Sequence, residues 1–194
     1  VNAQTSFTKF NGTGGPVLLK GAVTDFTDTT RWDFLTASDP EVIFYQDTFR
    51  LWYTSSSVFS GQYPYPRVGY AWSLDGISWT KYPANSPVFS GTSATWDSLS
   101  VETVSVLIDS AAPSGERYKM WYLGPGGTSY AYSQNGIDWE KPALALRPGT
   151  NVVHQARRDS ATVWLDLEEQ DPTRRFKFLY SAGHMRSLFL HYSA

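Results

Sequence analysis

The sequence lacks cysteine altogether, has no long apolar run and carries almost no net charge. Its 194 residues include 16 basic and 18 acidic side chains, a formal net charge of −2. A nearly neutral chain has no electrostatic footprint for nucleic acid or for an anionic membrane, so we expect neither as a partner. No run of 18 apolar residues and no signal-peptide pattern is present, which predicts a soluble chain without a spanning helix.

Several chemical motifs are missing as well. There is no Cys/His metal spacing, no Walker or dinucleotide-binding glycine loop and no G-x-S-x-G elbow, so we expect none of those chemistries. We expect no cofactor and no catalytic metal, although the sequence leaves open a structural calcium ion in a central channel. The absence of cysteine and the start at Val1 fit an exported product as readily as a cytosolic one, with an extracellular or periplasmic location slightly favoured.

What the sequence has in abundance is aromatic residues, at 16% with eight Trp and twelve Tyr, alongside 15 Gly and 11 Pro. Aromatic residues suit pleated surfaces, while Gly and Pro punctuate short strands. The composition therefore favours an all-β sandwich, barrel or propeller over a fold with long helices.

An internal repeat decides among these three. The segment 69–81 (GYAWSLDGISWTK) recurs as 129–141 (SYAYSQNGIDWEK), with seven of thirteen positions identical. A second matched set reads RLWY at 50–53, KMWY at 119–122 and KFLY at 177–180, and a Trp-Asp pair opens the first two units. The repeat gives one domain, 1–194, with units at about 32–95, 96–157 and 158–194.

Each complete unit is predicted to form four strands, for example 41–45, 50–54, 67–72 and 78–82. Asp75-Gly76 and Asn135-Gly136 suit a type I′ turn between the last two strands, because both dipeptides tolerate positive φ values. Four strands in a period of about 60 residues are typical of propeller blades. We therefore predict an all-β β-propeller of about three blades, either part of a five-bladed type or completed by oligomerisation or by a second segment.

Three carboxylates are the candidate catalytic residues. Alignment by the second strands places Asp39, Glu102 and Asp159 at the starts of the three first strands. The first strand of a propeller blade is innermost, so we expect these groups to share one cavity, where proximity and a low dielectric shift pKa values. Acidic residues at strand starts also cap turns, and that interpretation stays open for each of them.

The candidate substrate-binding residues are Trp72, Tyr63, Tyr65, His154, Arg158 and Trp164. Most other Trp residues repeat in register and are interpreted as blade packing, whereas Trp72, Trp164 and the loop tyrosines could line a rim. His154 could instead bind a backbone carbonyl, and Arg158, next to Asp159, could orient that carboxylate or a ligand hydroxyl or simply be a surface arginine.

These motifs resemble the five-bladed propeller glycoside hydrolases, the arabinanase, β-xylosidase and invertase group around families 43 and 32. The resemblance covers 16–194 and rests on Asp39-Pro40, the MWY-type strands and the G-Y-A-x-S-x-D-G-I-x-W hairpins. It implies an Asp base or nucleophile at Asp39, with a pKa-tuning Asp and a Glu acid at Glu102 and Asp159. The types at these last two positions are exchanged relative to the group.

The resemblance implies a glycosidase-like hydrolase acting on a neutral carbohydrate. The alternative is a non-catalytic carbohydrate-binding or assembly module. The separation of the carboxyl groups discriminates between the two, because about 5 to 9.5 Å between a pair is what glycoside chemistry needs.

Overall fold

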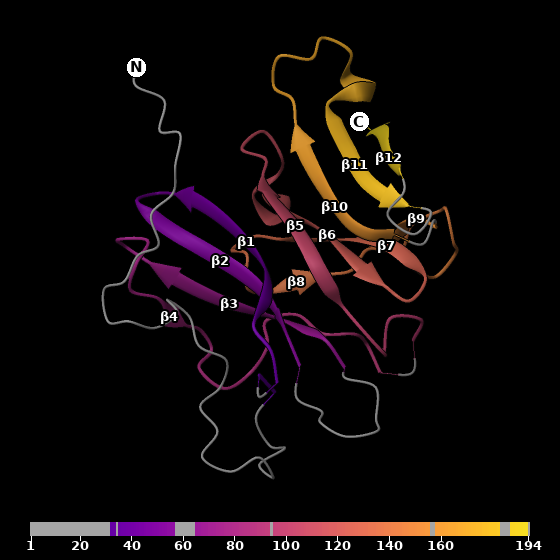
Figure 1. Ribbon diagram of the computed structural model, residues 1–194. Helices are drawn as coiled ribbons and strands as arrows, with labels where there is room; N and C mark the ends of the chain where they lie inside the picture. Colours follow the sequence, from indigo (N-terminus) through magenta and orange to yellow (C-terminus); the bar gives the residue numbers. More distant parts are fainter. Residues whose placement is uncertain are drawn as a thin grey trace.

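The computed structural model is an all-β chain in which three antiparallel sheets follow one another along the sequence (Figure 1). It describes residues 32–33, 35–56, 65–93, 95–155, 158–182 and 187–193, without the side chains of 158, 159 and 182. Within these ranges the helices are two short 3₁₀ turns, Ser114–Glu116 and Pro172–Arg174. Neither is long or apolar enough to cross a membrane.

Each sheet is a meander in which strands adjacent in sequence are paired. The first sheet contains β1 (Ser38–Tyr45), β2 (Thr48–Ser55), β3 (Arg67–Ser73) and β4 (Thr80–Lys81). The second contains β5 (Glu102–Ile108), β6 (Tyr118–Gly124), β7 (Gly127–Ser133) and β8 (Trp139–Glu140), with β9 (Val152–His154) also paired to β7. The third contains β10 (Arg158–Leu165), β11 (Phe176–Ala182) and β12 (Ser187–Ser193). This is the architecture of a partial β-propeller, as the repeat predicts.

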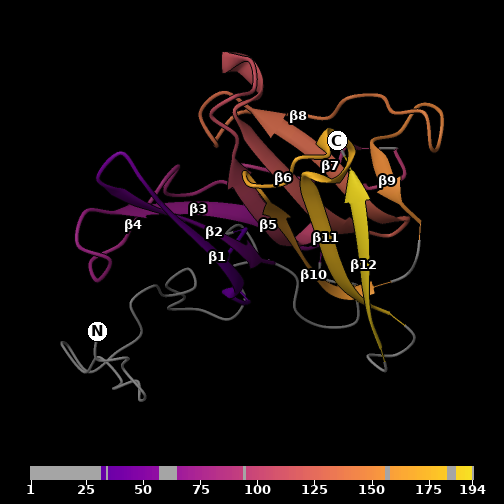
Figure 2. The ribbon, with the colours of Figure 1, turned by 90° about the horizontal axis from the view of Figure 1, so that it is seen from above.

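The first strands of the three sheets lie side by side. The Val106 N–H of β5 donates to Glu41 Oε1 of β1 at 3.2 Å, and the Val163 N–H of β10 donates to Ser105 Oγ of β5 at 3.0 Å. Viewed from above, the sheets follow one another from the indigo first sheet to the yellow third sheet (Figure 2). The first strands are thus the inner strands.

The main core lies between the first and second sheets. Trp52 of β2 is fully buried against Tyr118 of β6, with ring centroids 6.3 Å apart, and Phe89 packs edge-on against Tyr122 at 4.8 Å. Phe89 belongs to the predicted closing segment 87–89 and bridges Val68 of β3. The corresponding segment 16–19 lies outside the described residues.

The two hairpin turns are equivalent, but they are not type I′ turns. In both, a serine at the end of the third strand accepts the glycine N–H at 2.9 Å, from Gly76 to Ser73 and from Gly136 to Ser133. Of the two central residues only the glycine has positive φ, +71° at Gly76 and +78° at Gly136. The Asp75 and Asn135 side chains instead accept the next backbone N–H groups, which makes a longer loop and leaves the fourth strand two residues long.

A buried ion pair ties each complete unit together. The Asp of each Trp-Asp pair meets the lysine that follows the hairpin, Lys81 with Asp33 at 2.7 Å and Lys141 with Asp97 at 2.5 Å. Both carboxylates are 1% exposed. Burying a charge in this way requires the partner that the repeat supplies.

Candidate functional site

The predicted catalytic carboxylates all lie at the starts of the inner strands. Asp39 is in β1, Glu102 is the first residue of β5 and Asp159 is in β10. Each start carries a register shift in which the inner strand has one extra residue, between Ser38 and Glu41, between Glu102 and Ser105, and between Arg158 and Ala161. Such β-bulges redirect side chains and occur often beside active sites.

The strand pairing corrects the predicted alignment of Asp39 by one residue. Ser38 pairs with Thr54 and Glu102 with Leu123, which are equivalent positions of the second strands. Asp39 therefore corresponds to Thr103, and Ser38 corresponds to Glu102. The backbone agrees, because Asp39 and Thr103 both have φ of +48°. The prediction failed because the units were aligned by their second strands, while the connection between the first and second strands differs in length, from Tyr45 to Thr48 in the first sheet and from Ile108 to Tyr118 in the second.

Positive φ at these two positions is unusual. Threonine is β-branched, so a φ of +48° at Thr103 is an energetically costly backbone conformation. Residues in such conformations cluster at functional sites, where the surrounding structure holds them. Here the Thr103 N–H donates to Thr54 Oγ1 of the first sheet at 3.1 Å, so the bulge of β5 is anchored beside the start of β1.

The surroundings of the carboxylates differ. Asp39 is exposed, and its Oδ2 accepts a hydrogen bond from Ser38 Oγ at 3.2 Å. Glu102 is half-buried. The Asp159 side chain is outside the described part of the chain. That the three carboxyl groups face one cavity stays a prediction.

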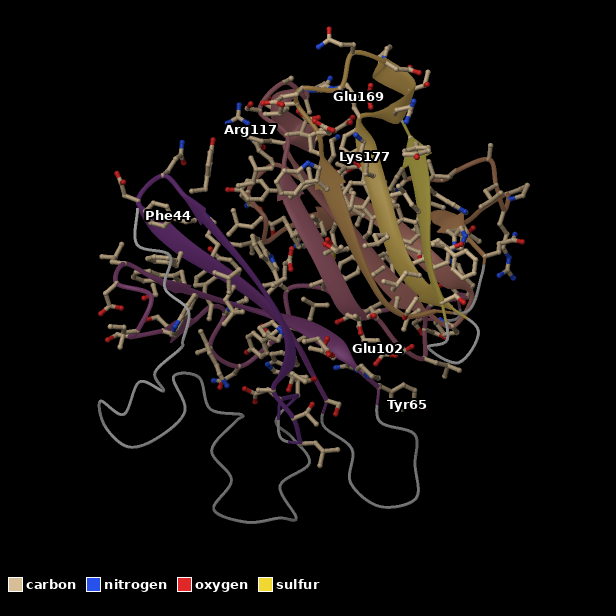
Figure 3. The ribbon with its side chains drawn as sticks, turned by 45° about the horizontal axis from the view of Figure 1, so that its top comes forward. Phe44, Tyr65, Glu102, Arg117, Glu169 and Lys177 are labelled. Atoms are coloured by element: carbon tan, nitrogen blue, oxygen red, sulfur yellow. The ribbon has the colours of Figure 1, made fainter. Side chains whose placement is uncertain are left out.

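Tyr65 lies at the same end of the sheets as Glu102. Figure 3 shows both at this end, with Arg117, Glu169 and Lys177 at the opposite end. The placement agrees with the hydrogen bond from the Val101 N–H to the Pro66 carbonyl at 3.1 Å, which joins the residues next to Glu102 and Tyr65. Tyr65 is 38% exposed. Tyr63, predicted beside it, lies outside the described residues.

The two candidate tryptophans lie in different sheets, Trp164 in β10 of the third sheet and Trp72 in β3 of the first sheet. Trp164 is 69% exposed and pairs with Lys177, the position that Ile43 takes opposite Arg50. Ile43 packs against the core between the first two sheets, so Trp164 lies on the equivalent face of the third sheet. Trp72, 36% exposed, pairs with Thr80 of the outer strand β4. A role of either in substrate binding stays a prediction.

His154 lies in a cluster between the second and third sheets. Its ring centroid is 4.5 Å from that of Tyr180 and 4.9 Å from that of His191. It lines a cavity of about 470 Å³ that does not include Asp39 or Glu102. Arg158 opens β10, but its side chain is not among those described.

Glu41 is an inner-strand carboxylate that the sequence alignment left aside. Burial raises its pKa above the ordinary value, and the hydrogen bond from the Val106 N–H opposes that shift. Glu41 and Ser105 occupy the position just after the bulge, and each accepts an N–H from the next inner strand. Knowledge of the bulge would have been needed to see this, because in sequence Glu41 reads as one more residue of a strand.

The described side chains, which leave out that of Asp159, contain no group of three or more His, Cys, Asp or Glu residues that could hold a metal ion.

Comparisons with known proteins give matches among solved structures. No protein-family model matches the chain, and no curated protein matches it. A glycosyl hydrolase from Bacteroides ovatus is 18% identical with a TM-score of 0.58, and the match covers 77% of this chain and 44% of that one. A structure from the GH130 family of mannoside phosphorylases, which contains glycoside hydrolases that target β-1,2-mannosidic linkages in Candida mannan, is 19% identical with a TM-score of 0.58 over 77% and 44% of the two chains.

A third similar structure is an exo-β-1,3-galactanase from Clostridium thermocellum, at 16% identity and a TM-score of 0.53, covering 82% of this chain and 34% of that one. This chain spans about half the length of the first matched structures, 44% and 53% in the first two. At these identities the likeness establishes a shared fold. The chain thus has a partial propeller fold of the kind found in glycoside hydrolases.

Proposed function

We propose that the chain is part of a carbohydrate-active propeller that hydrolyses glycosidic bonds of a neutral glycan. Asp39, Glu102 and Asp159 are the proposed acid, base or nucleophile groups, and Tyr65 the proposed rim residue. The observation that carries the proposal is that the inner strands are held side by side near their bulged starts. Thr103 in the bulge of β5 donates to Thr54 of β2, which pairs with Ser38 at the start of β1, and Val163 of β10 donates to Ser105 just after the bulge of β5. Carboxylates on such neighbouring strands can approach within the distance that glycoside chemistry needs.

The shared fold supports the substrate class. The matched structures include an exo-β-1,3-galactanase and a structure from a family that contains glycoside hydrolases targeting β-1,2-mannosidic linkages, and galactose and mannose are both neutral sugars. The near-neutral charge of the chain suits an uncharged glycan as well. The arabinanase-like assignment and the family 43 or 32 membership belong to this proposal.

A screen of aryl-glycosides and polysaccharides tests the activity directly. With a hydrolysable substrate, Asp39→Asn should lower kcat by about 10² or more, because a positioned acid or base contributes at least that much. Asp47→Asn is the matched control, since Asp47 lies at the other end of β1 and also has positive φ, +56°. Near-normal turnover of Asp39→Asn would remove Asp39 from the mechanism.

One observation favours the alternative of a carbohydrate-binding or assembly module without hydrolysis. Asp39 and Glu102 are not at equivalent positions of their strands, so their carboxyl groups do not repeat around the axis. A crystal structure with a bound oligosaccharide separates the two functions. Carboxyl pairs about 5 to 9.5 Å apart across the scissile bond fit hydrolysis, and larger gaps fit binding alone.

A further inference from the structure

The interface between the first and second sheets is filled by a hairpin of the second sheet. The Trp52 indole N–H donates to the Gly136 carbonyl at 2.8 Å, and the Trp139 ring lies 6.4 Å from the rings of both Trp52 and Phe89. Ile137 packs against the same core. The segment 136–139 is therefore the plug of this interface.

The matching position between the second and third sheets is the cavity of about 470 Å³. The residues that line it include Lys119, Trp121, Tyr130 and His154 from the second unit and Phe176 and Ser193 from the third. Within the described residues this lining contains no Asp or Glu. The cavity therefore lacks the acid pair of a glycoside-cleaving site.

The walls of the cavity repeat the walls of the filled interface. His154 bridges Thr128 as Phe89 bridges Val68, and it meets Tyr180 at 4.5 Å as Phe89 meets Tyr122 at 4.8 Å. Trp121 lies 5.8 Å from Phe176, as Trp52 lies 6.3 Å from Tyr118.

The polar contacts repeat too. Lys119 reaches the Tyr130 hydroxyl at 3.4 Å, and Arg50 reaches the Tyr70 hydroxyl at 3.1 Å. Ser193, which lines the cavity, pairs with Phe176 as Ser133 pairs with Tyr118, so it is the counterpart of the serine that begins the plugging turn. Among the described strands of the third sheet, β10 to β12, there is no counterpart of 136–139.

We propose that this cavity is a docking site for a peptide hairpin of the type Ser-x-Asn/Asp-Gly-Ile-x-Trp. The glycine carbonyl accepts the Trp121 indole N–H, while the isoleucine and tryptophan side chains fill the space between His154 and Phe176. We choose this occupant because segment 136–139 fills the interface between the first and second sheets, and the walls of that interface match those of the cavity. Docking of this kind concerns assembly and does not depend on the proposed hydrolase activity.

The test is the 194-residue chain extended after Ala194 by a copy of 135–141, which places the asparagine two residues after Ser193, as Asn135 follows Ser133. The control carries the same extension with its isoleucine and tryptophan replaced by serine. Burial of two large apolar side chains should raise the midpoint of thermal unfolding by at least about 4 °C in the first chain only. Equal midpoints for the two extensions would overturn the proposal.

A second variant tests the contact itself. Trp121→Phe removes the indole donor, so it should lower the unfolding midpoint more in the extended chain than in the 194-residue chain. Equal lowering in the two would contradict the docking geometry. Saccharide binding that depends on Trp121 and is unaffected by the extension would identify an open sugar site and would also overturn the proposal.

Discussion

Glu41 and Asp97 are two partly or fully buried carboxylates whose pKa values move in opposite directions. Burial raises the pKa of Glu41 above its ordinary value of 4.5. Burial alone would also raise the pKa of Asp97, but the hydrogen bonds from Lys141, the Thr92 N–H and Thr95 outweigh burial and lower it. The difference arises because Glu41 contacts a single backbone donor, whereas Asp97 also has a lysine.

These shifts predict opposite pH effects. A raised pKa means that the folded chain binds more protons, so the stability that Glu41 contributes is complete below its ordinary pKa and is lost as the pH rises through the folded value. Glu41→Gln keeps an acceptor for Val106 and should therefore gain stability relative to the wild type as the pH rises above the ordinary value of 4.5. Urea unfolding of both proteins at several pH values measures this difference in the free energy of unfolding.

Asp97→Asn serves as the contrast, because a lowered pKa contributes stability above the ordinary pKa that is lost as the pH falls through the folded value. This variant should therefore lose stability relative to the wild type as the pH rises toward the ordinary value of 3.8, and the difference should stay constant above that pH. Parallel pH profiles for both variants would contradict the assignment of the two shifts.

At the scale of elements, the two hairpin turns have the same hydrogen bonds but different surroundings. A Cβ on Gly136 would lie 2.8 Å from Trp52 Cζ2 and 3.0 Å from Tyr118 Cδ1, whereas a Cβ on Gly76 would lie 3.4 Å from the Phe49 ring. Both glycines have positive φ. Gly76→Ala therefore probes the backbone alone, and Gly136→Ala probes the backbone and the interface together.

We expect Gly76→Ala to lower the free energy of unfolding by about 1 to 2 kcal/mol. Gly136→Ala should cost about 1 to 3 kcal/mol more, because the added methyl overpacks the buried Trp52. Chemical denaturation of the two variants measures the difference. Equal losses of unfolding free energy in the two variants would mean that Gly136 is not tightly packed against Trp52.

Much of the element scale is predictable from the sequence, because the repeat encodes it. The hairpins, the strand order and the equivalence of the two turns follow from matched motifs at 69–81 and 129–141. The bulges do not, since one extra residue at Asp39 or Thr103 has no signature in composition. The alignment of Asp39 was wrong by one position for a different reason: the connection from the first to the second strand differs in length between the units, so matched second strands do not fix the register of the first strands.

At the scale of the molecule, the third sheet presents an apolar face. Trp164, Leu188 and Leu190 are 69%, 71% and 46% exposed, and Leu179 is 39% exposed. Their counterparts in the first sheet, such as Ile43 and Trp52, pack against the next sheet. Apolar faces of this kind mark interaction surfaces, and we propose that another blade, from a second copy or a further segment, covers it.

This proposal predicts association of the 194-residue chain. Leu188→Lys should weaken it by placing a charge on the face, while Leu167→Lys, at a loop leucine that is 72% exposed, should not. Light scattering over a range of concentrations measures the mass. A monodisperse species of 21.7 kDa at all concentrations would contradict the proposal.

The contacts between inner strands have a consequence for how such a molecule evolves. Across each interface a backbone N–H donates to a side-chain oxygen in the inner strand of the preceding sheet. Val106 donates to Glu41, and Val163 donates to Ser105. Every amino acid except proline carries a backbone N–H, so the residue that donates can change without loss of the hydrogen bond. The accepting side chain is a glutamate in one interface and a serine in the other. Duplicated units can therefore diverge widely and still stack in one direction, which explains how three sheets with so few identical inner-strand residues share one arrangement.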